Sequence, residues 1–185
     1  MIQLVLSESK DKMEKTIIAT KSELGKIRTG RASLSLLDSV RVDYYGSMVP
    51  LKQVANMGIP EPRMITVQPW DKSMIGAVEK AILQADIGIT PNSDGHIIRL
   101  PIPALTEERR KELVKIVSQL GEEGKVAIRN IRRDAIDQFK AAQKSHDISE
   151  DEEYNGGIDI QKMTDEYVEK IDKIVEAKEK EIMEV

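Results

Sequence analysis

The sequence predicts an α+β protein with two domains, in which a small β/α/β domain is inserted into a long antiparallel three-helix bundle. Three stretches, at residues 1–28, 106–145 and 149–185, carry apolar residues with the 3.6-residue period of amphipathic helices. Between the first two, apolar and polar residues alternate and are interrupted by proline and glycine, which is typical of short strands and turns. With 185 residues, 40% of them hydrophobic, the chain can bury a core in each domain.

The first helix is expected to run up to Arg28. Lysine and glutamate occupy most of its surface, no proline interrupts it, and its apolar face includes Met13, Ile17, Leu24 and Ile27. Gly30 follows the last periodic residue and has the position of a C-terminal cap.

The inserted domain is expected to hold several short strands and one helix. Its strands are predicted at residues 40–44, 48–51, 64–67 and 97–100. Gly46-Ser47 supplies the turn between the first two strands, and PNSDG at 91–95 supplies the turn before the last. Ser73 is expected to cap the helix, whose apolar face includes Ile75, Val78, Ile82 and Leu83.

The second and third bundle helices are the longest predicted elements. From Thr106 the apolar period persists for about 40 residues, which at ~1.5 Å per residue gives a helix of nearly 60 Å. Its apolar side is expected to include Leu113, Ile116, Val117, Leu120, Ala127, Ile131 and Ala135. The third helix begins near Ser149, where SEDE has the spacing of a capping box. Glycines at 121 and 124 and at 156–157 are expected to soften the two helices locally.

These boundaries predict a discontinuous bundle of residues 1–30 plus 105–185, with the inserted domain at 31–104. The two connections, near 29–31 and 101–105, are rich in residues that interrupt regular structure and are expected to act as hinges. The predicted hinge residues are Thr29, Gly30, Arg31, Pro101, Pro103 and Ala104. An extended coiled coil is the alternative architecture, although the apolar residues do not keep a strict heptad.

The sequence offers no standard catalytic or cofactor motif. The chain lacks cysteine, its glycines do not have the spacing of phosphate-binding loops, and its two histidines, His96 and His146, fall in different predicted domains. No apolar run approaches the roughly 20 residues that a membrane span needs. We therefore expect no catalytic residue, no metal, no cofactor and no membrane contact.

The strongest chemical signal is a basic ridge on the second bundle helix, formed by Lys125, Arg129, Arg132 and Arg133. On an ideal helix these four residues fall within ~100° of one another, and Lys111 and Lys115 project onto the same side. Guanidinium groups pair with phosphates, so the ridge favours contact with an RNA backbone. Aromatic residues make up only 3% of the chain, which disfavours recognition by base stacking. The alternative is an ordinary solvated helix face, and Glu122 interrupts the ridge.

Several local strings occur in the order found in one family. They are KIRTGRAS at 26–33, LLDSVRVDYYG at 36–46, AVEKAI at 77–82, PNSDG at 91–95, LTEERRKEL at 105–113 and VAIRNIRRDA at 126–135. In these strings, over essentially its full length, the chain resembles the bacterial ribosome-recycling factor family.

The resemblance implies an L-shaped, two-domain monomer in the cytoplasm that is not an enzyme. Such a factor binds the post-termination ribosome through large-subunit ribosomal RNA. With elongation factor G and GTP, it promotes separation of the subunits and release from mRNA. By the same resemblance Arg129, Arg132 and Arg133 contact the RNA, with Lys125 beside them in the ridge.

The resemblance is less specific for other surfaces. Arg28 and Arg31 are weaker candidates for RNA contact, and the strand end at 44–46 is a candidate contact for elongation factor G, although its tyrosines could instead simply pack within the sheet. A helical adaptor protein is the main rival function and would bind a protein partner but no ribosome. An enzyme is the third possibility.

Overall fold

The computed structural model describes residues 1–184 and has helices together with two small sheets, so the predicted α+β class is confirmed and the coiled coil is wrong. The described chain divides into two compact units. One unit joins Met1–Arg28 to Glu107–Glu184, and we call it the helical unit; the other spans Thr29–Thr106, and we call it the inserted unit. Along the described residues, no helix combines the length and the apolarity that crossing a membrane would require.

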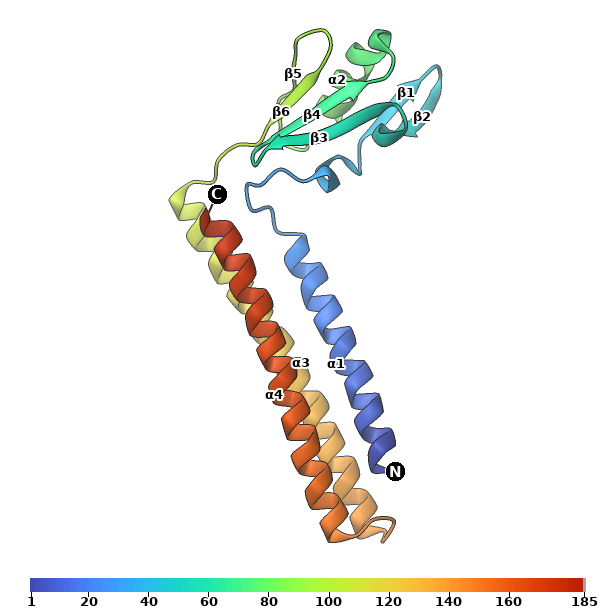
Figure 1. Cartoon of the computed structure of the whole chain (residues 1–185), viewed down its shortest axis with the longest axis vertical. Coiled ribbons are helices and arrows are strands. Elements are labelled where there is room, and N and C mark those ends of the chain that lie inside the picture. Colours follow the sequence, from blue (N-terminus) through green and yellow to red (C-terminus); the bar gives the residue numbers. More distant parts are fainter. Residues whose placement is uncertain (185) are drawn as a thin grey trace. The chain divides into compact units, whose positions relative to one another are not determined.

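The helical unit consists of α1 (Ile2–Gly25), α3 (Glu107–Lys144) and α4 (Glu150–Glu184). Helices that follow one another in this unit run in opposite directions, so α1 and α4 run the same way (Figure 1). The first helix is shorter than predicted, because it ends at Gly25. Gly30 does adopt a left-handed conformation, with φ 78°, but it lies five residues beyond the helix and does not cap it.

The core of the helical unit lies where the three helices meet. Its most completely buried side chains include Met13 of α1, Ile128 and Phe139 of α3, and Ile160 and Ile171 of α4. Burying each such side chain stabilises the fold by roughly 1.5–3 kcal/mol. The buried face of α3 differs from the prediction: Ile128, Gly121 and Gly124 are part of it, whereas Ile116 is exposed. The predicted residues Leu120, Ala127 and Ile131 are only partly buried.

Helix α4 begins with the capping box that the sequence predicts. The backbone N–H of Glu152 donates to Ser149 Oγ at 3.2 Å, and the backbone N–H of Ser149 donates to Glu152 Oε2 at 2.8 Å. The helix then continues without interruption through Gly156 and Gly157. The expected irregularity in its first turns is therefore absent.

Three glycines let the helices of this unit approach closely. A Cβ atom added to Gly121 would lie 2.5 Å from Cγ2 of Val175 on α4, and one added to Gly124 would lie 2.8 Å from Thr20 Oγ1 on α1. At Gly156 an added Cβ would lie 3.2 Å from the Phe139 ring. All three glycines are buried, so they serve the close packing of the helices.

The inserted unit contains a hairpin and a four-stranded sheet. The predicted hairpin is present and joins β1 (Arg41–Tyr44) to β2 (Ser47–Pro50), but its two-residue turn is at Tyr45 and Gly46, one residue earlier than predicted, and Ser47 belongs to β2. Both turn residues have positive φ, 50° and 91°, which is the conformation of the type I′ turn that matches strand twist.

The larger sheet has the strand order β3-β4-β6-β5, and all its pairs are antiparallel. Its strands are β3 (Ala55–Glu61), β4 (Met64–Pro69), β5 (Asn92–Ser93) and β6 (Ile98–Pro101). The sequence did not predict β3, which contains Pro60. Because β3 is an edge strand and bulges between Gly58 and Glu61, this proline removes no essential ladder hydrogen bond.

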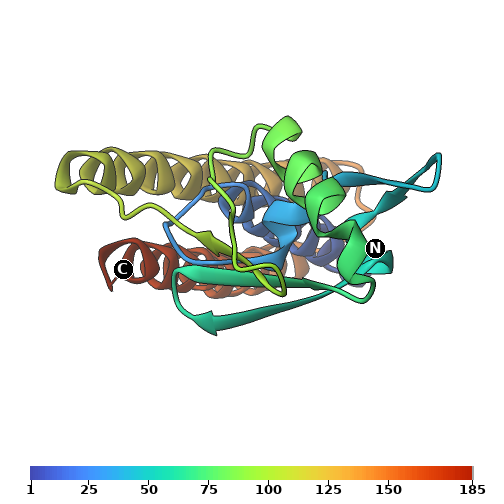
Figure 2. The same ribbon diagram turned by 90° about the horizontal axis from the view of Figure 1, so that it is seen from above.

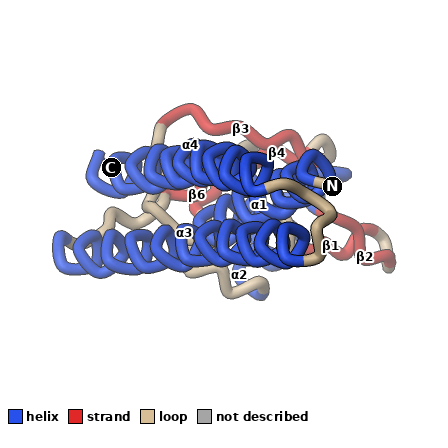
Figure 3. The backbone as a smooth tube through the Cα atoms, turned by 90° about the horizontal axis from the view of Figure 1, so that it is seen from below, coloured by secondary structure: helices blue, strands red, loops and turns tan. Residues whose placement is uncertain are grey.

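Helix α2 (Ile75–Gln84) lies against the strands of the inserted unit (Figures 2 and 3). The core of this unit includes Ile65, Ile98 and Leu100, which are completely buried. A short 3₁₀ turn at Lys72–Met74 precedes it, and Asp71 caps that turn by accepting the Ser73 N–H at 3.0 Å. Ser73 is therefore not the cap. Of the predicted apolar face, Val78 and Ile82 are buried and Leu83 is exposed.

Candidate nucleic-acid interface

The residues on the outer side of α3 are those opposite the side chains that the helix buries against α1 and α4. Ile128 and Gly124 face the other two helices, and on an ideal helix Arg129 and Arg133 point about 100–140° away from Ile128. Both arginines are accordingly exposed, and the Arg129 side chain keeps 46% of its surface in solvent. They lie one helical turn apart, about 6 Å along the axis. This pair presents two guanidinium groups to solvent on a rigid element.

Lys125 occupies a different position from these two arginines. Its side chain is only 18% exposed, and its Nζ pairs with Asp172 of α4 and, at 3.2 Å, with Glu122. The hydrogen bond to Asp172 is the main reason that the pKa of Lys125 is raised. Lys125 therefore links α3 to α4, and two carboxylates already neutralise much of its charge.

Arg132 is also turned toward α4. It is half-buried, and its Nη1 donates to Gln161 Oε1 at 2.9 Å. Gln161 in turn donates to Asp165 at 2.8 Å. One edge of the guanidinium is thus oriented by a neighbouring helix.

Glu122 interrupts the ridge, as the sequence indicated. Besides its contact with Lys125, its other oxygen lies 4.0 Å from Nη1 of Arg129. A surface ion pair of this length contributes at most about 1 kcal/mol and is screened by salt, so a phosphate can replace it at Arg129.

The outward row of cations is longer than predicted by one residue, Lys140. Lys111 and Lys115 precede the arginines on this side, and Lys140 follows Arg133 by seven residues. All three lysines are exposed, and Lys111 pairs with Glu107 at 2.9 Å. The seven-residue spacing from Arg133 is the signal by which Lys140 could have been found.

Arg28 and Arg31 are both exposed, but they belong to different units: Arg28 is the last residue of the helical unit's first segment, and Arg31 lies in the inserted unit. Each of them has an interaction partner within the chain.

The candidate hinge residues do not all lie in free loops. The Ala32 N–H donates to Pro62 O at 2.7 Å, and the Ile102 N–H donates to Arg63 O at 2.8 Å. Pro101 is the last residue of β6, whereas Thr29, Gly30, Arg31, Pro103 and Ala104 lie outside helices and strands. The irregular connections between the two units thus cover about residues 26–31 and 103–106, so the first is longer than predicted because α1 ends at Gly25, and the second begins later.

Hydrogen bonds in both units hold carboxyl groups in the charged form. The pKa of Asp94 lies well below its usual range, chiefly because it accepts the Ile97 N–H, with Arg99 adding to the effect. The Tyr167 hydroxyl lowers the pKa of Glu14 in a similar way. A general acid at neutral pH needs the opposite shift. Among residues 1–184, no three potential ligands are grouped so that they could hold a metal ion.

A long three-helix unit joined by two chain connections to a small α+β unit, with cations along the outer face of α3, is typical of a two-unit binding factor. Residues 20–183 match the family described as ribosome recycling factor, and the chain belongs to that family.

The curated relatives are close and match end to end. The ribosome-recycling factor of Bacillus subtilis is 57% identical over 185 residues, which is 100% of both chains. That of Cupriavidus necator is 60% identical over 174 residues, or 94% of each chain. The predicted family resemblance is therefore confirmed, and with it the function of a translation factor in ribosome recycling.

Two solved structures are similar over nearly the whole chain. A solution structure of the ribosome recycling factor matches with a TM-score of 0.73 and 40% identity, covering 100% of this chain and 98% of the other. The second is described as models for the T. thermophilus factor and the E. coli elongation factor G bound to the E. coli post-termination complex. It matches with a TM-score of 0.63 and 44% identity, over 98% of each chain.

Proposed function

We propose that this factor binds the post-termination ribosome by placing the outer face of α3 against large-subunit ribosomal RNA. The observation that carries the proposal is the exposed pair Arg129 and Arg133, one turn apart on a helix that is held on its other side by α1 and α4. Each guanidinium can donate paired hydrogen bonds to a phosphate, and each neutralised phosphate releases condensed cations.

The predicted site residues then divide by role. Arg129 and Arg133 make the primary phosphate contacts, and Arg132 adds a contact whose direction is fixed by Gln161. Lys125 chiefly holds α3 against α4 and contributes charge to the same face. Arg28 and Arg31 supplement the contact from the connection between the units.

The related factor in the post-termination complex, described together with elongation factor G, supports the assignment of partners. On this proposal the chain has no catalytic activity of its own, and GTP hydrolysis by elongation factor G supplies the energy for separating the subunits and releasing mRNA. The factor acts as a monomer in the cytoplasm, where bacterial ribosomes are found, and needs no cofactor.

We further propose that the two short connections, at 26–31 and 103–106, let the inserted unit rotate while both of its ends stay attached. Two parallel connections permit limited rotation and prevent free tumbling. The force from elongation factor G would reach the ribosome through this jointed unit.

Sedimentation of the protein with post-termination ribosomes tests the RNA contact. The double variant Arg129→Glu/Arg133→Glu should weaken binding at least tenfold and flatten its dependence on salt, since about two phosphate contacts are lost. Lys15→Glu/Lys21→Glu, two reversals at exposed positions on α1 with the same change in net charge, is the matched control and should bind nearly as well as the parent chain. Equal binding by the double variant and the control would refute the proposed interface.

The hinge needs a separate assay, because it concerns splitting and not binding. A disulfide engineered between the units should leave sedimentation with ribosomes unchanged and reduce the separation of subunits by elongation factor G and GTP. Reduction of the disulfide should restore the rate. Full splitting activity in the crosslinked state would show that rotation is unnecessary.

A further inference from the structure

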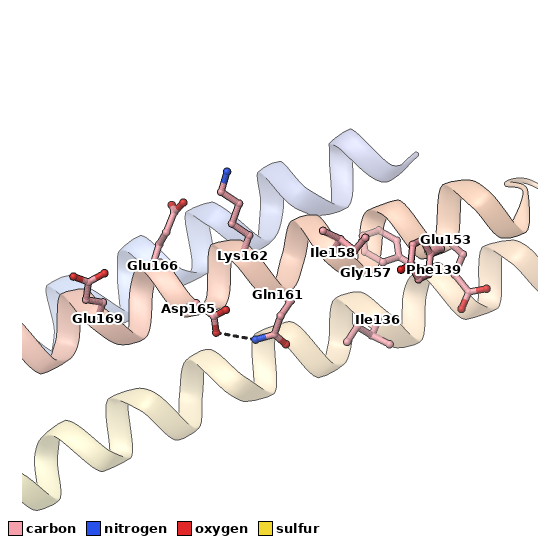
Figure 4. A pocket seen from close by; sticks show the side chains of 11 residues that line it. Ile136, Phe139, Glu153, Gly157, Ile158, Gln161, Lys162, Asp165, Glu166 and Glu169 are labelled. Atoms are coloured by element: carbon pink, nitrogen blue, oxygen red, sulfur yellow. Dashed lines mark hydrogen bonds between the residues drawn. The ribbon is translucent and has the colours of Figure 1, made fainter.

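A shallow groove of about 820 Å³ lies on the outer face of α4 and the adjoining edge of α3. Its apolar part includes Ile136 and Phe139 from α3 and Ile158 from α4 (Figure 4). Tyr154 of α4 also lines it. Phe139 is almost completely buried, so it forms the floor, while the two α4 residues stand at the surface. The groove contains neither Arg129 nor Arg133.

The two surface residues expose more apolar area than the fold requires. Tyr154 is 71% exposed and Ile158 is 51% exposed, and they are successive neighbours on one helix face. Apolar residues that gather on a surface with a polar rim mark interaction sites more often than isolated ones do. A bound partner would remove this surface from water.

The rim of the groove is strongly acidic. Four carboxyl groups line it, those of Glu153, Asp165, Glu166 and Glu169, against the single ammonium group of Lys162. Residues 146–185 carry 14 Asp/Glu against 5 Lys/Arg, so the surroundings add to the negative potential. Such a surface repels RNA phosphates and attracts cations.

We propose that this groove is a docking site for a basic amphipathic segment of another protein. The apolar side chains of the segment would cover Tyr154 and Ile158, and its lysines or arginines would pair with Asp165 and Glu166. Recognition of this kind needs both an apolar anchor and charge of the correct sign, and the groove supplies both within three turns of α4. The inference extends beyond the RNA contact and does not depend on it.

Fluorescence anisotropy with a labelled peptide tests the proposal on the full chain. The probe is a peptide of leucine and arginine arranged with the helical period, and the reference peptide has the same composition in scrambled order. The helical probe should bind more tightly than the scrambled one. Ile158→Ala should weaken that binding about tenfold, because it removes three carbon atoms that pass from half-exposed to buried.

Asp165→Asn/Glu166→Gln should weaken the same binding by a similar factor at low salt and by less at high salt. Ile18→Ala and Glu8→Gln, at exposed positions on α1, are the matched controls and should bind the probe like the parent chain. Circular dichroism should show unchanged helix content for all variants, since every substituted side chain is exposed.

Three results would overturn the proposal. Equal affinity for the helical and scrambled peptides would show that the groove attracts cationic peptides by charge alone. Loss of binding in the acidic double variant without loss in Ile158→Ala would show that the exposed apolar side chains of the groove are not used. Concentration-dependent self-association in sedimentation equilibrium that Ile158→Ala abolishes would assign the groove to a second copy of this chain.

Discussion

Gly121 offers the sharpest test of how the helical unit is packed. In the interior of an exposed helix, Gly→Ala stabilises by about 1 kcal/mol. At Gly121, however, the new methyl group would lie 2.5 Å from Cγ2 of Val175, and forcing a methyl group into a packed site costs about 1–3 kcal/mol. The expected net effect is therefore destabilisation by about 0–2 kcal/mol. Chemical denaturation followed by helix circular dichroism measures it.

Gly157 is the matched control, since it also lies within a helix but has open space where a Cβ atom would stand. Gly157→Ala should stabilise by about 1 kcal/mol, so the gap between the two variants measures the packing cost alone, about 1–3 kcal/mol. Adding Val175→Ala should recover part of the loss at Gly121, a coupling of at least about 0.5 kcal/mol in a double-mutant cycle. If Gly121→Ala stabilises as much as Gly157→Ala, the close approach of α3 and α4 is wrong.

Three further outcomes follow from the hydrogen bonds described above. Ser149→Ala removes the cap of α4 and should lower the free energy of unfolding by about 1 kcal/mol, measured by thermal melting, whereas no change would disprove the cap. Asp94 has a lowered pKa, so its ionised carboxylate stabilises the fold above its unfolded pKa of about 3.9, and this stabilisation is lost as the pH falls below that value. Asp94→Asn should therefore reduce the fall in the free energy of unfolding on acidification. Burial is the largest cause, and the hydrogen bond to Glu14 the second, of the raised pKa of Tyr167, which is about 12. The protonated hydroxyl therefore stabilises the fold below pH ~10, and this stabilisation is lost between about pH 10 and 12. Spectrophotometric titration of tyrosine ionisation checks this, and Tyr167→Phe should abolish the late-titrating group.

The sequence predicted the elements whose signals are local and strong. The long apolar periods predicted α3 and α4, and the alternation before Gly46 predicted the hairpin. Strand β3 was missed because Pro60 argues against a central strand. An edge strand tolerates proline, but the position of a strand within its sheet depends on tertiary structure and cannot be read from the sequence. Asp71 was overlooked as a cap because a 3₁₀ turn precedes α2, and such a turn has no clear periodic signal.

The basic ridge was predicted in composition but not in orientation. The sequence projection centred the inner side of α3 on Leu113, Leu120 and Ile131, of which only Leu113 is buried, whereas the observed inner side also passes through Gly121 and Gly124. Glycine carries no apolar side chain, so its burial cannot be read from hydrophobic periodicity. The helix is consequently rotated relative to the projection, and the rotation brings Lys125 and Arg132 toward α4.

The backbone hydrogen bonds from Ala32 to Pro62 and from Ile102 to Arg63 have a consequence for folding. They join the entry and the exit of the inserted unit to adjacent residues of one β-turn, so the folded insert holds its two ends close together. For the helical unit, an ordered insert then acts as a short loop between α1 and α3. If residues 29–106 were unfolded, closing that longer loop would cost roughly 2 kcal/mol more. Early folding of the insert should thus speed assembly of the helices.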